Sequence, residues 1–370
     1  SLYSTRPLSS PCCTLLFLPL DDLLPAAAGI SCNLPSPISL LLLGCFRYIG
    51  RGWTFDDLDE STCIHEETHR QFFHVFIHWA STRLYDDMVT YPRVWADAKK
   101  HMSEFAMAGL HGSVGSTDAT HIGMERCFYR LKNHHSGGKL SMPSRTYNLT
   151  CNHRRRILSS TRGHPGRWND KTLVLFDEFV MGIHRGEILQ DVEFELLERN
   201  NQSGEIVSVL YKGVWLIVDN GYLRWPISIC PYKQTEMYKE IRFSEWLESM
   251  RKDVECTFGI LKGRFRVLKT GIRIHGIQAT DKIWLTCCAL HNMLLDIDGL
   301  DREWEKGIAT DWEGELGEHN SGDVSNFAVC RLRSPQERRR YDSNGMGQGN
   351  DRDDDDGGGG GGDPGELPVP

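Results

Sequence analysis

A continuous run of apolar residues at 214–218 ends at Asp219 and is followed by a turn at Asn220 and Gly221. Consecutive apolar side chains are typical of a strand that is covered on both faces. A carboxylate at the carboxyl end of such a strand lies where open α/β sheets bind ligands. The pattern therefore predicts a buried strand that presents Asp219 at a ligand-binding edge.

The segment 244–268 has apolar residues at steps of three and four, which predicts a long helix with one face in the core. Glu255 lies at the edge of this stripe, so the helix directs a second acid toward Asp219. A competing interpretation is that Glu255 pairs on the surface with Arg251 or Lys252, one helical turn earlier. The apolar stripe consists of Leu247, Met250, Val254, Phe258, Leu261 and Phe265.

Alternating side chains over residues 112–124 predict a strand in which Asp118 shares a face with Val114 and Ile122. An aspartate on the inward face of a strand needs a hydrogen-bonding partner or a cation. Two interpretations stay open at this point. Either local turn hydrogen bonds satisfy Asp118, or Asp118 contributes to a cation site.

The rest of the core is predicted from shorter patterns. Strands at 144–153 and 154–163 form a hairpin, Asp170 caps a helix over 171–186, and an apolar helix covers 278–293. The resulting order of three strands, a helix, a strand and a helix predicts an α/β fold. Side chains of the last helix that are expected to pack in the core are Cys287, Cys288 and His291.

Three short helices are predicted within residues 37–82, with Thr54 as the cap of the second. Short helices joined by tight turns are compatible with a helix-turn-helix domain that contacts DNA. The alternative is a helical packing subdomain with no role in nucleic-acid binding. The predicted division of the chain is a poorly defined segment 1–36, this helical domain 37–82, a linker and entry helix 83–111, a core 112–298 and an acidic, glycine-rich disordered tail 299–370.

The formal net charge of −8 is concentrated near the C-terminal end of the chain. Residues 301–370 hold 17 acidic and 8 basic residues, a net of −9, so residues 1–300 carry about +1 and are compatible with a nucleic-acid partner. The 12 cysteines show no C-x-x-C spacing, which favours reduced thiols. The N-terminal apolar stretch is interrupted by proline and aspartate, so no membrane span is predicted.

Positive charge gathers around Glu255. Basic runs are usually solvated helix faces, but next to convergent acids they suit the phosphate backbone of DNA. A second basic cluster, within residues 154–167, precedes Asp170. The residues expected to contact DNA are Arg251, Lys252, Lys262, Arg264 and Arg266.

Five blocks carry a family resemblance: GSTDATHI, GHPGRWNDKTLV, VDNGY, RKDVECTFGILKGRFRVL and LHNML. Together they resemble the PIF/Harbinger-type transposases, in particular the plant-transposon-protein branch, over residues 38–298. The resemblance implies a ribonuclease-H-like mixed sheet flanked by helices, with a helix-turn-helix-like all-α segment before it. The sequence departs from the family at Val218, where the family usually has Gly or Ala, and at Asn220.

Carried over by position, the resemblance implies a catalytic and metal-binding triad of Asp118, Asp219 and Glu255 with two Mg²⁺ or Mn²⁺ ions. Hard oxygen ligands suit these ions, which activate water and stabilise the leaving oxygen. His121 is expected to assist near the scissile phosphate. Asp170 is expected to hold the metal ligands in position without binding the metal itself. The implied function is a transposase-type DNA endonuclease that cleaves DNA strands and transfers them at the same site.

Two other functions are weighed against this one. The first is a catalytically inactive, transposon-derived DNA-binding protein. The second is an unrelated metal-dependent hydrolase of small phosphate esters, which the basic clusters disfavour. The resemblance also implies a Myb-like DNA-binding partner, and together with the proposed chemistry it predicts a nuclear location. A second copy of the chain is considered as a further partner.

Overall fold

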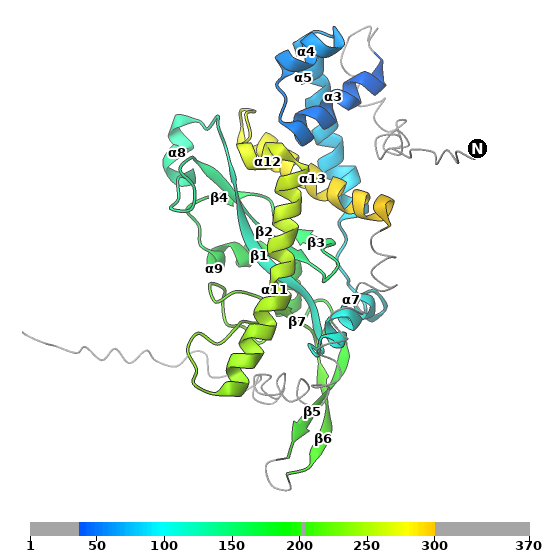
Figure 1. Ribbon diagram of the computed structural model, residues 1–370, viewed down its shortest axis with the longest axis vertical. Coiled ribbons are helices and arrows are strands. Elements are labelled where there is room, and N and C mark those ends of the chain that lie inside the picture. The colour runs from blue at the N-terminus through cyan, green and yellow to red at the C-terminus, as the bar shows by residue number, and fades with distance from the viewer. Residues whose placement is uncertain (1–36, 201–203, 300–370) are drawn as a thin grey trace, which may run out of the picture. The chain divides into compact units, whose positions relative to one another are not determined.

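The computed structural model describes residues 37–200 and 204–299 of the chain. A mixed sheet with the order β3-β2-β1-β7-β8 forms its centre, and β4 pairs with β2 beside β3 (Figure 1). Strands β3, β2 and β1 run antiparallel, whereas β7 and β8 run parallel to β1. The predicted α/β class is confirmed. The strands are β1 (Ser113–Gly123), β2 (Ser144–Cys151), β3 (Ile157–Ser160), β4 (His164–Pro165), β7 (Trp215–Ile217) and β8 (Ser228–Ile229).

The long helix α11 (Tyr238–Arg264) crosses one face of β1 and β2, as Figure 1 shows. The six apolar stripe residues predicted for this helix are all buried, so the predicted core face is confirmed. The predicted end of the helix is wrong, because Phe265 leaves the helical conformation at φ −113° and ψ 85°. A separate short helix, α12 (Arg266–Thr270), follows, and α13 (Ile277–Asp298) completes the layer.

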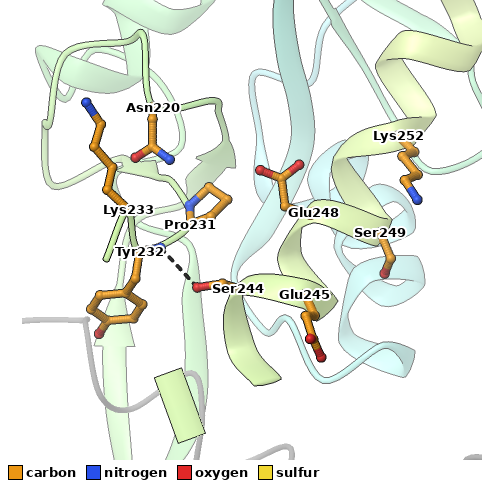
Figure 2. Close-up of a pocket in the computed structure, with 9 residues that line it drawn as sticks. All are labelled: Asn220, Pro231, Tyr232, Lys233, Ser244, Glu245, Glu248, Ser249 and Lys252. Atoms are coloured by element: carbon orange, nitrogen blue, oxygen red, sulfur yellow. Dashed lines mark hydrogen bonds between the residues drawn. The ribbon is translucent and has the colours of Figure 1, made fainter. Parts of the chain in front are cut away.

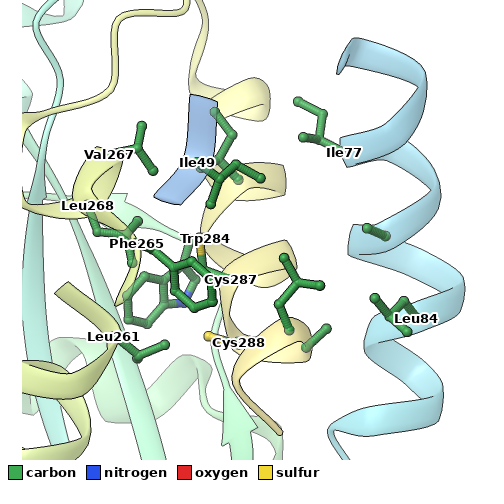
Figure 3. Packing of buried hydrophobic residues seen from close by; sticks show 14 of the residues in the cluster. Ile49, Ile77, Leu84, Leu261, Phe265, Val267, Leu268, Trp284, Cys287 and Cys288 are labelled. Atoms are coloured by element: carbon green, nitrogen blue, oxygen red, sulfur yellow. The ribbon is translucent and has the colours of Figure 1, made fainter. Parts of the chain in front are cut away.

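The N-terminal helices pack directly against this layer. They are α3 (Ile38–Arg51), α4 (Phe55–Thr62) and α5 (Glu66–Trp79), and α5 continues through a π-helical turn (Ala80–Leu84) into α6 (Tyr85–Met88). Figure 3 shows Ile49 and Ile77 in the same cluster as Leu261 and Trp284. The helical segment and the sheet therefore share one hydrophobic core.

The predicted cap of α4 is confirmed. The Thr54 hydroxyl accepts a hydrogen bond from the Asp57 amide at 3.1 Å, and the Asp57 carboxylate accepts one from the Thr54 amide at 2.7 Å. This reciprocal pair satisfies two amides that the first turn would otherwise leave unpaired. It fixes where the second of the three short helices begins.

A second apolar cluster lies around the buried strand β7, and it contains elements that the sequence analysis missed. Helix α7 (Trp95–Met107), within the expected entry segment, contributes Phe105. The missed elements are β5 (Glu193–Arg199) and β6 (Ile206–Lys212), an antiparallel hairpin. It contributes Phe194 and Tyr211 to this cluster. Charged residues alternate with apolar ones along β5, and this alternation was the signal that identifies the strand.

The helix predicted over 171–186 is wrong in two respects. Asn169, not Asp170, is the N-cap, because its side chain accepts a hydrogen bond from the Thr172 amide at 2.9 Å. The helix also breaks at Asp177, whose buried carboxylate accepts hydrogen bonds from the amides of Phe179 and Val180. The segment is thus divided into α9 (Asp170–Leu173), a 3₁₀ turn (Val174–Phe176) and α10 (Glu178–His184). The Asp170 carboxylate is not used as a cap.

The last helix has the core role that its sequence predicted. Cys287 and Cys288 are fully buried, and His291 Nε2 hydrogen-bonds the carbonyl of Arg155 at 2.9 Å. The eight cysteines that the structure describes are free. In residues 37–200 and 204–299, no helix combines the length and apolar character needed to cross a bilayer. The predicted segment 1–36 and the predicted tail from residue 300 onward lie outside the described residues.

Candidate active site

The sheet brings Asp118 and Asp219 to neighbouring strands. Ser116 of β1 is paired with Ile217 of β7, and the two strands are parallel. Asp118 follows two residues later on β1, and Asp219 lies two residues beyond the last residue of β7, so the two acids come close together where β7 ends. Asp118 Oδ1 accepts a hydrogen bond from the Ala119 amide at 2.7 Å, which holds the carboxylate close to its own backbone.

Asp170, the first residue of α9, joins this pair at Gly221. Asp219 Oδ1 accepts a hydrogen bond from the Gly221 amide at 2.8 Å. A Cβ on residue 221 would lie 3.0 Å from Asp219 Oδ1 and 3.1 Å from Asp170 Oδ2. Both carboxylates therefore press against Gly221, and only a residue without a side chain leaves them this room.

The electrostatics of Asp118 reflect the same convergence. The pKa of Asp118 is raised to about 6, chiefly by burial and also by the nearby charges of Asp219 and Asp170, while the Ala119 amide and Arg251 oppose the shift. The pKa of Asp170 is raised by burial and by Asp219, against the opposing effect of Lys139. Like charges that crowd in a partly buried site favour either a proton or a cation. The three aspartates thus form one electrostatic unit.

Glu255 is connected to this unit through Arg251. The Arg251 Nη2 atom lies 2.8 Å from Glu255 Oε1 and 2.9 Å from Glu248 Oε2, whereas Nη1 lies 3.6 Å from Asp118 Oδ2. The guanidinium therefore stands between the helix-borne glutamate and the strand-borne aspartate. The pairing of Glu255 with Arg251, the competing interpretation of the sequence, is present in the structure.

The donor set fits a divalent cation in chemistry, although its present arrangement is not a complete metal site. Within the described parts of the chain, no group of three or more His, Cys, Asp or Glu side chains is arranged to hold a metal ion. However, Asp170 Oδ1 and Asn220 Oδ1 are buried and have no hydrogen-bond partner. Buried oxygens without partners are costly, and Mg²⁺ prefers hard oxygen ligands of this kind. Glu255 could join Asp118 and Asp219 around a cation only after it releases Arg251.

His121 lies on the opposite face of β1 from Asp118, three residues along the strand. Its Nδ1 lies 3.1 Å from Thr146 Oγ1, and its Nε2 is buried without a hydrogen-bond partner. Burial, together with the charges of Lys139 and Lys262, lowers the pKa of His121 to about 4. His121 is therefore neutral at physiological pH, and no hydrogen bond or ion pair of the described residues joins it to the three aspartates.

The five basic residues proposed for DNA contact divide into distinct positions. Arg251 faces the acids, and Lys262 donates a hydrogen bond to Thr120 Oγ1 at 2.9 Å, on the same face of β1 as Asp118. Arg264 pairs with Asp298 at 3.3 Å. Lys252 and Arg266 are exposed. In the second basic cluster, Arg154 pairs with Glu104 at 2.6 Å and Arg156 with Asp296 at 2.5 Å, so these residues hold helices in place.

A groove lies between two loop segments, Asn220 after β7 and residues 231–233 after β8, and residues 244–252 of α11. Figure 2 shows Asn220 and Lys233 on one side and Glu248 and Lys252 on the other. The groove is closed at one end by a hydrogen bond from the Tyr232 amide to Ser244 Oγ at 3.0 Å. Lys233 was missed from the sequence because the loop around it has no periodic pattern. Two of its lining residues are connected to the acids, because Asn220 follows Asp219 and Glu248 pairs with Arg251.

Comparison with known proteins gives one match. Residues 116–292 match a family model described as DDE superfamily endonuclease. Searches of curated proteins and of solved structures found no match. The matched segment starts two residues before Asp118 and includes Asp170, Asp219 and Glu255, and it supports the DDE transposase superfamily for this part of the chain.

Proposed function

We propose that the chain is a transposase-type DNA endonuclease that cleaves DNA strands and, at the same site, transfers a freed 3′ end. The observation that carries the proposal is that the parallel pairing of β1 with β7 brings Asp118 close to Asp219, within a segment that matches a DDE superfamily endonuclease. The antiparallel meander β3-β2-β1 followed by parallel β7 and β8 supports a ribonuclease-H-like core. The sequence blocks favour the PIF/Harbinger branch.

Asp118 and Asp219 would hold Mg²⁺ or Mn²⁺, and Glu255 would complete the site once Arg251 has moved away from it. When bound, such ions lower the pKa of water and stabilise charge on the leaving oxygen. Asp170 would support the ligands from the α9 side, where its Oδ1 accepts no hydrogen bond and lies 3.9 Å from Lys139 Nζ. The released Arg251 guanidinium would then be free to contact a phosphate group.

The DNA backbone would follow the groove of Figure 2 and the exposed side of α11. Lys233 and Lys252 line the groove, and Arg266 lies exposed beyond the end of the helix. Contacts of lysine and arginine to phosphates release counterions, so binding should weaken steeply with salt. The carboxylates alone would repel DNA, and these cations would offset that repulsion.

The test is cleavage of a duplex that carries terminal inverted repeats by the purified full chain with Mg²⁺ or Mn²⁺. Asp118→Asn and Asp219→Asn should abolish cleavage while thermal unfolding stays cooperative. Asp191→Asn is the matched control, because Asp191 is exposed and lies before β5, outside the site. Undiminished cleavage by Asp118→Asn would refute the assignment.

The second candidate is a transposon-derived DNA-binding protein that has lost catalysis. The contact between Glu255 and Arg251 favours it, because the glutamate already has a partner. Titration with Mn²⁺ separates the two functions. Thermal stabilisation by Mn²⁺ that is lost in Asp118→Asn supports the endonuclease, whereas DNA binding without any metal response supports the second candidate.

Three further proposals concern location and partners. We propose a nuclear location from the DNA substrate, a Myb-like DNA-binding partner from the family resemblance, and assembly with a second copy of the chain. Fractionation of nuclei and analytical ultracentrifugation with and without terminal-repeat DNA test these three proposals separately. A protein confined to the cytoplasm would contradict the nuclear assignment.

A further inference from the structure

Three aromatic rings pack on one another next to Asp170. The rings of His164 and Trp168 stack with centroids 5.1 Å apart and an interplanar angle of 18°. The Phe176 ring lies 4.9 Å from His164 and 5.3 Å from Trp168. We call these three residues the aromatic platform. Neither hydrophobic core cluster of the described residues includes Trp168 or Phe176, so the platform is not an extension of the core.

The platform is open to solvent. Phe176 is 52% exposed, and its neighbour Leu175 is 47% exposed. An aromatic ring that only stabilised the fold would gain more by being buried. His164 and Phe176 also line a hollow together with Arg93 and Arg162. The platform thus presents aromatic surface to a space that a flat ligand can enter.

Basic residues lie near the platform: Arg162 lines the same hollow, and Arg167 and Lys171 are close to Trp168 along the chain. Arg162, Arg167 and Lys171 are exposed and form no ion pair with any described residue. Aromatic rings combined with lysine and arginine are the means by which proteins hold unpaired nucleotides, because the bases stack and the phosphates meet positive charge. A base inside a duplex is covered on both faces by its neighbours. Only a base that has left the duplex could stack on this platform.

The platform lies close to the proposed catalytic site along the chain. Trp168 precedes Asp170 by two residues, a span of at most about 7 Å. Asp170 in turn lies against Gly221 beside Asp219. We infer that the aromatic platform binds one unpaired nucleobase of the DNA strand near the scissile phosphate, an inference that rests on the proposed function. Holding that base outside the duplex would open the strand at the point where it is cut.

The experiment uses the full chain in EDTA buffer, so that binding is measured without cleavage. Two otherwise identical duplexes carry 2-aminopurine, either paired or as a single unpaired base, and fluorescence and dissociation constants are recorded. We expect the wild type to quench the unpaired probe and to bind that duplex about 5- to 100-fold more tightly than the paired one. Phe176→Leu and Trp168→Leu keep apolar bulk but remove the ring, and should reduce both effects.

Tyr129→Leu is the matched control, because Tyr129 is an aromatic residue that is 91% exposed in α8 (Tyr129–His135), another part of the fold. It should retain the quenching of the probe and the tighter binding of the duplex with the unpaired base.

Variants are compared only after thermal unfolding shows that they are folded. Phe176→Tyr, which keeps a ring, should behave as the wild type. A folded Phe176→Leu variant with full preference for the unpaired base would overturn the inference. If the wild type binds and cleaves duplex DNA without that preference, this inference fails alone; if it binds no DNA, the proposed function fails with it.

Discussion

The acids borne by strands and the acid borne by a helix are held in different ways. Asp118 on β1 and Asp219 just after β7 each accept a hydrogen bond from a nearby backbone amide, and the pairing of these two strands brings the acids together. Glu255 depends on a single side chain, Arg251, and its own side chain is 49% exposed. Hydrogen bonds to the backbone fix the position of a carboxylate once the chain has folded. An exposed ion pair, by contrast, is weak and can exchange partners. The strand end is therefore the fixed half of the site, and the helix is the adjustable half.

The largest effect should come from the fixed half. Asp118→Asn removes a carboxylate from the crowded pair but keeps its shape, and we expect cleavage to fall at least about a thousandfold, as the loss of several kcal/mol of metal-assisted stabilisation would require. Asp219→Asn should be equally severe. Initial rates of plasmid nicking in Mn²⁺ measure both, with Asp191→Asn as the control. Equal rates in wild type and Asp219→Asn would show that the strand end is not the site.

A smaller but specific effect is expected at Gly221. Alanine there places a Cβ about 3 Å from carboxylate oxygens of both Asp219 and Asp170, which must move apart. We expect the Mn²⁺ concentration for half-maximal cleavage to rise about tenfold, equivalent to ~1.4 kcal/mol, with little change in thermal stability. Gly138→Ala is the matched control, since a Cβ at that position meets no atom within 4 Å. If Gly221→Ala needed the same Mn²⁺ concentration as the wild type, the contact of Asp170 with Gly221 would have no role in metal binding.

Variants of the two residues in the adjustable half, Arg251 and Glu255, should change the affinity for Mn²⁺ in opposite directions. Arg251→Gln removes the cation that competes for Asp118 and Glu255, so Mn²⁺ should stabilise the folded chain at about threefold to tenfold lower concentration. Glu255→Gln removes a proposed ligand, so more Mn²⁺ should be needed, by about tenfold. Both variants should cleave more slowly. Thermal shift as a function of Mn²⁺ measures the affinity.

Lys252→Gln controls for the loss of positive charge on α11, because Lys252 is exposed and lies beside Arg251. It should leave the metal response unchanged. If Arg251→Gln and Lys252→Gln shift the Mn²⁺ midpoint alike, the effect of Arg251 is one of overall charge and not of its position between the two acids.

The same comparison separates what the sequence could and could not predict. The strands that carry the acids could be predicted because their signals are local. An apolar run stops at Asp219, and an alternating pattern assigns Asp118 to one face of its strand. The apolar stripe of α11 could be predicted for the same reason. The partner of Glu255 was not, because Arg251 and Lys252 are both one turn away, and only the approach of Asp118 on β1 favours Arg251.

The errors around Asp170 have a long-range cause as well. Asp177 reads as a helix-interior residue, but its carboxylate also accepts a hydrogen bond from Asn148 of β2 at 2.7 Å. That buried contact with the sheet stabilises Asp177 as the N-cap of a new helix, so the predicted helix is interrupted there. Asn169 and Asp170 are both good caps, so the choice between them is not encoded locally. Because Asn169 takes the cap, Asp170 is left to face Asp219.

The smallest effect is expected on the face of β1 that points away from the acids. His121 has a pKa of about 4 in the folded chain, below the usual value of about 6.5 in the unfolded chain, chiefly because it is buried. Between these values the unfolded chain binds the extra proton, so the stabilising contribution of neutral His121 is complete above pH 6.5 and is lost as the pH falls toward 4. The wild type should therefore lose more stability than His121→Gln between pH 7 and pH 5, and cleavage at pH 7.5 should change less than about threefold, since a neutral ring adds little charge stabilisation. Urea unfolding at several pH values and nicking rates measure the two effects.

A loss of cleavage in His121→Gln as large as that of Asp118→Asn would contradict this prediction. It would mean that His121 reaches the scissile phosphate although it lies on the opposite face of β1. The site would then contain a third group besides its fixed and adjustable halves.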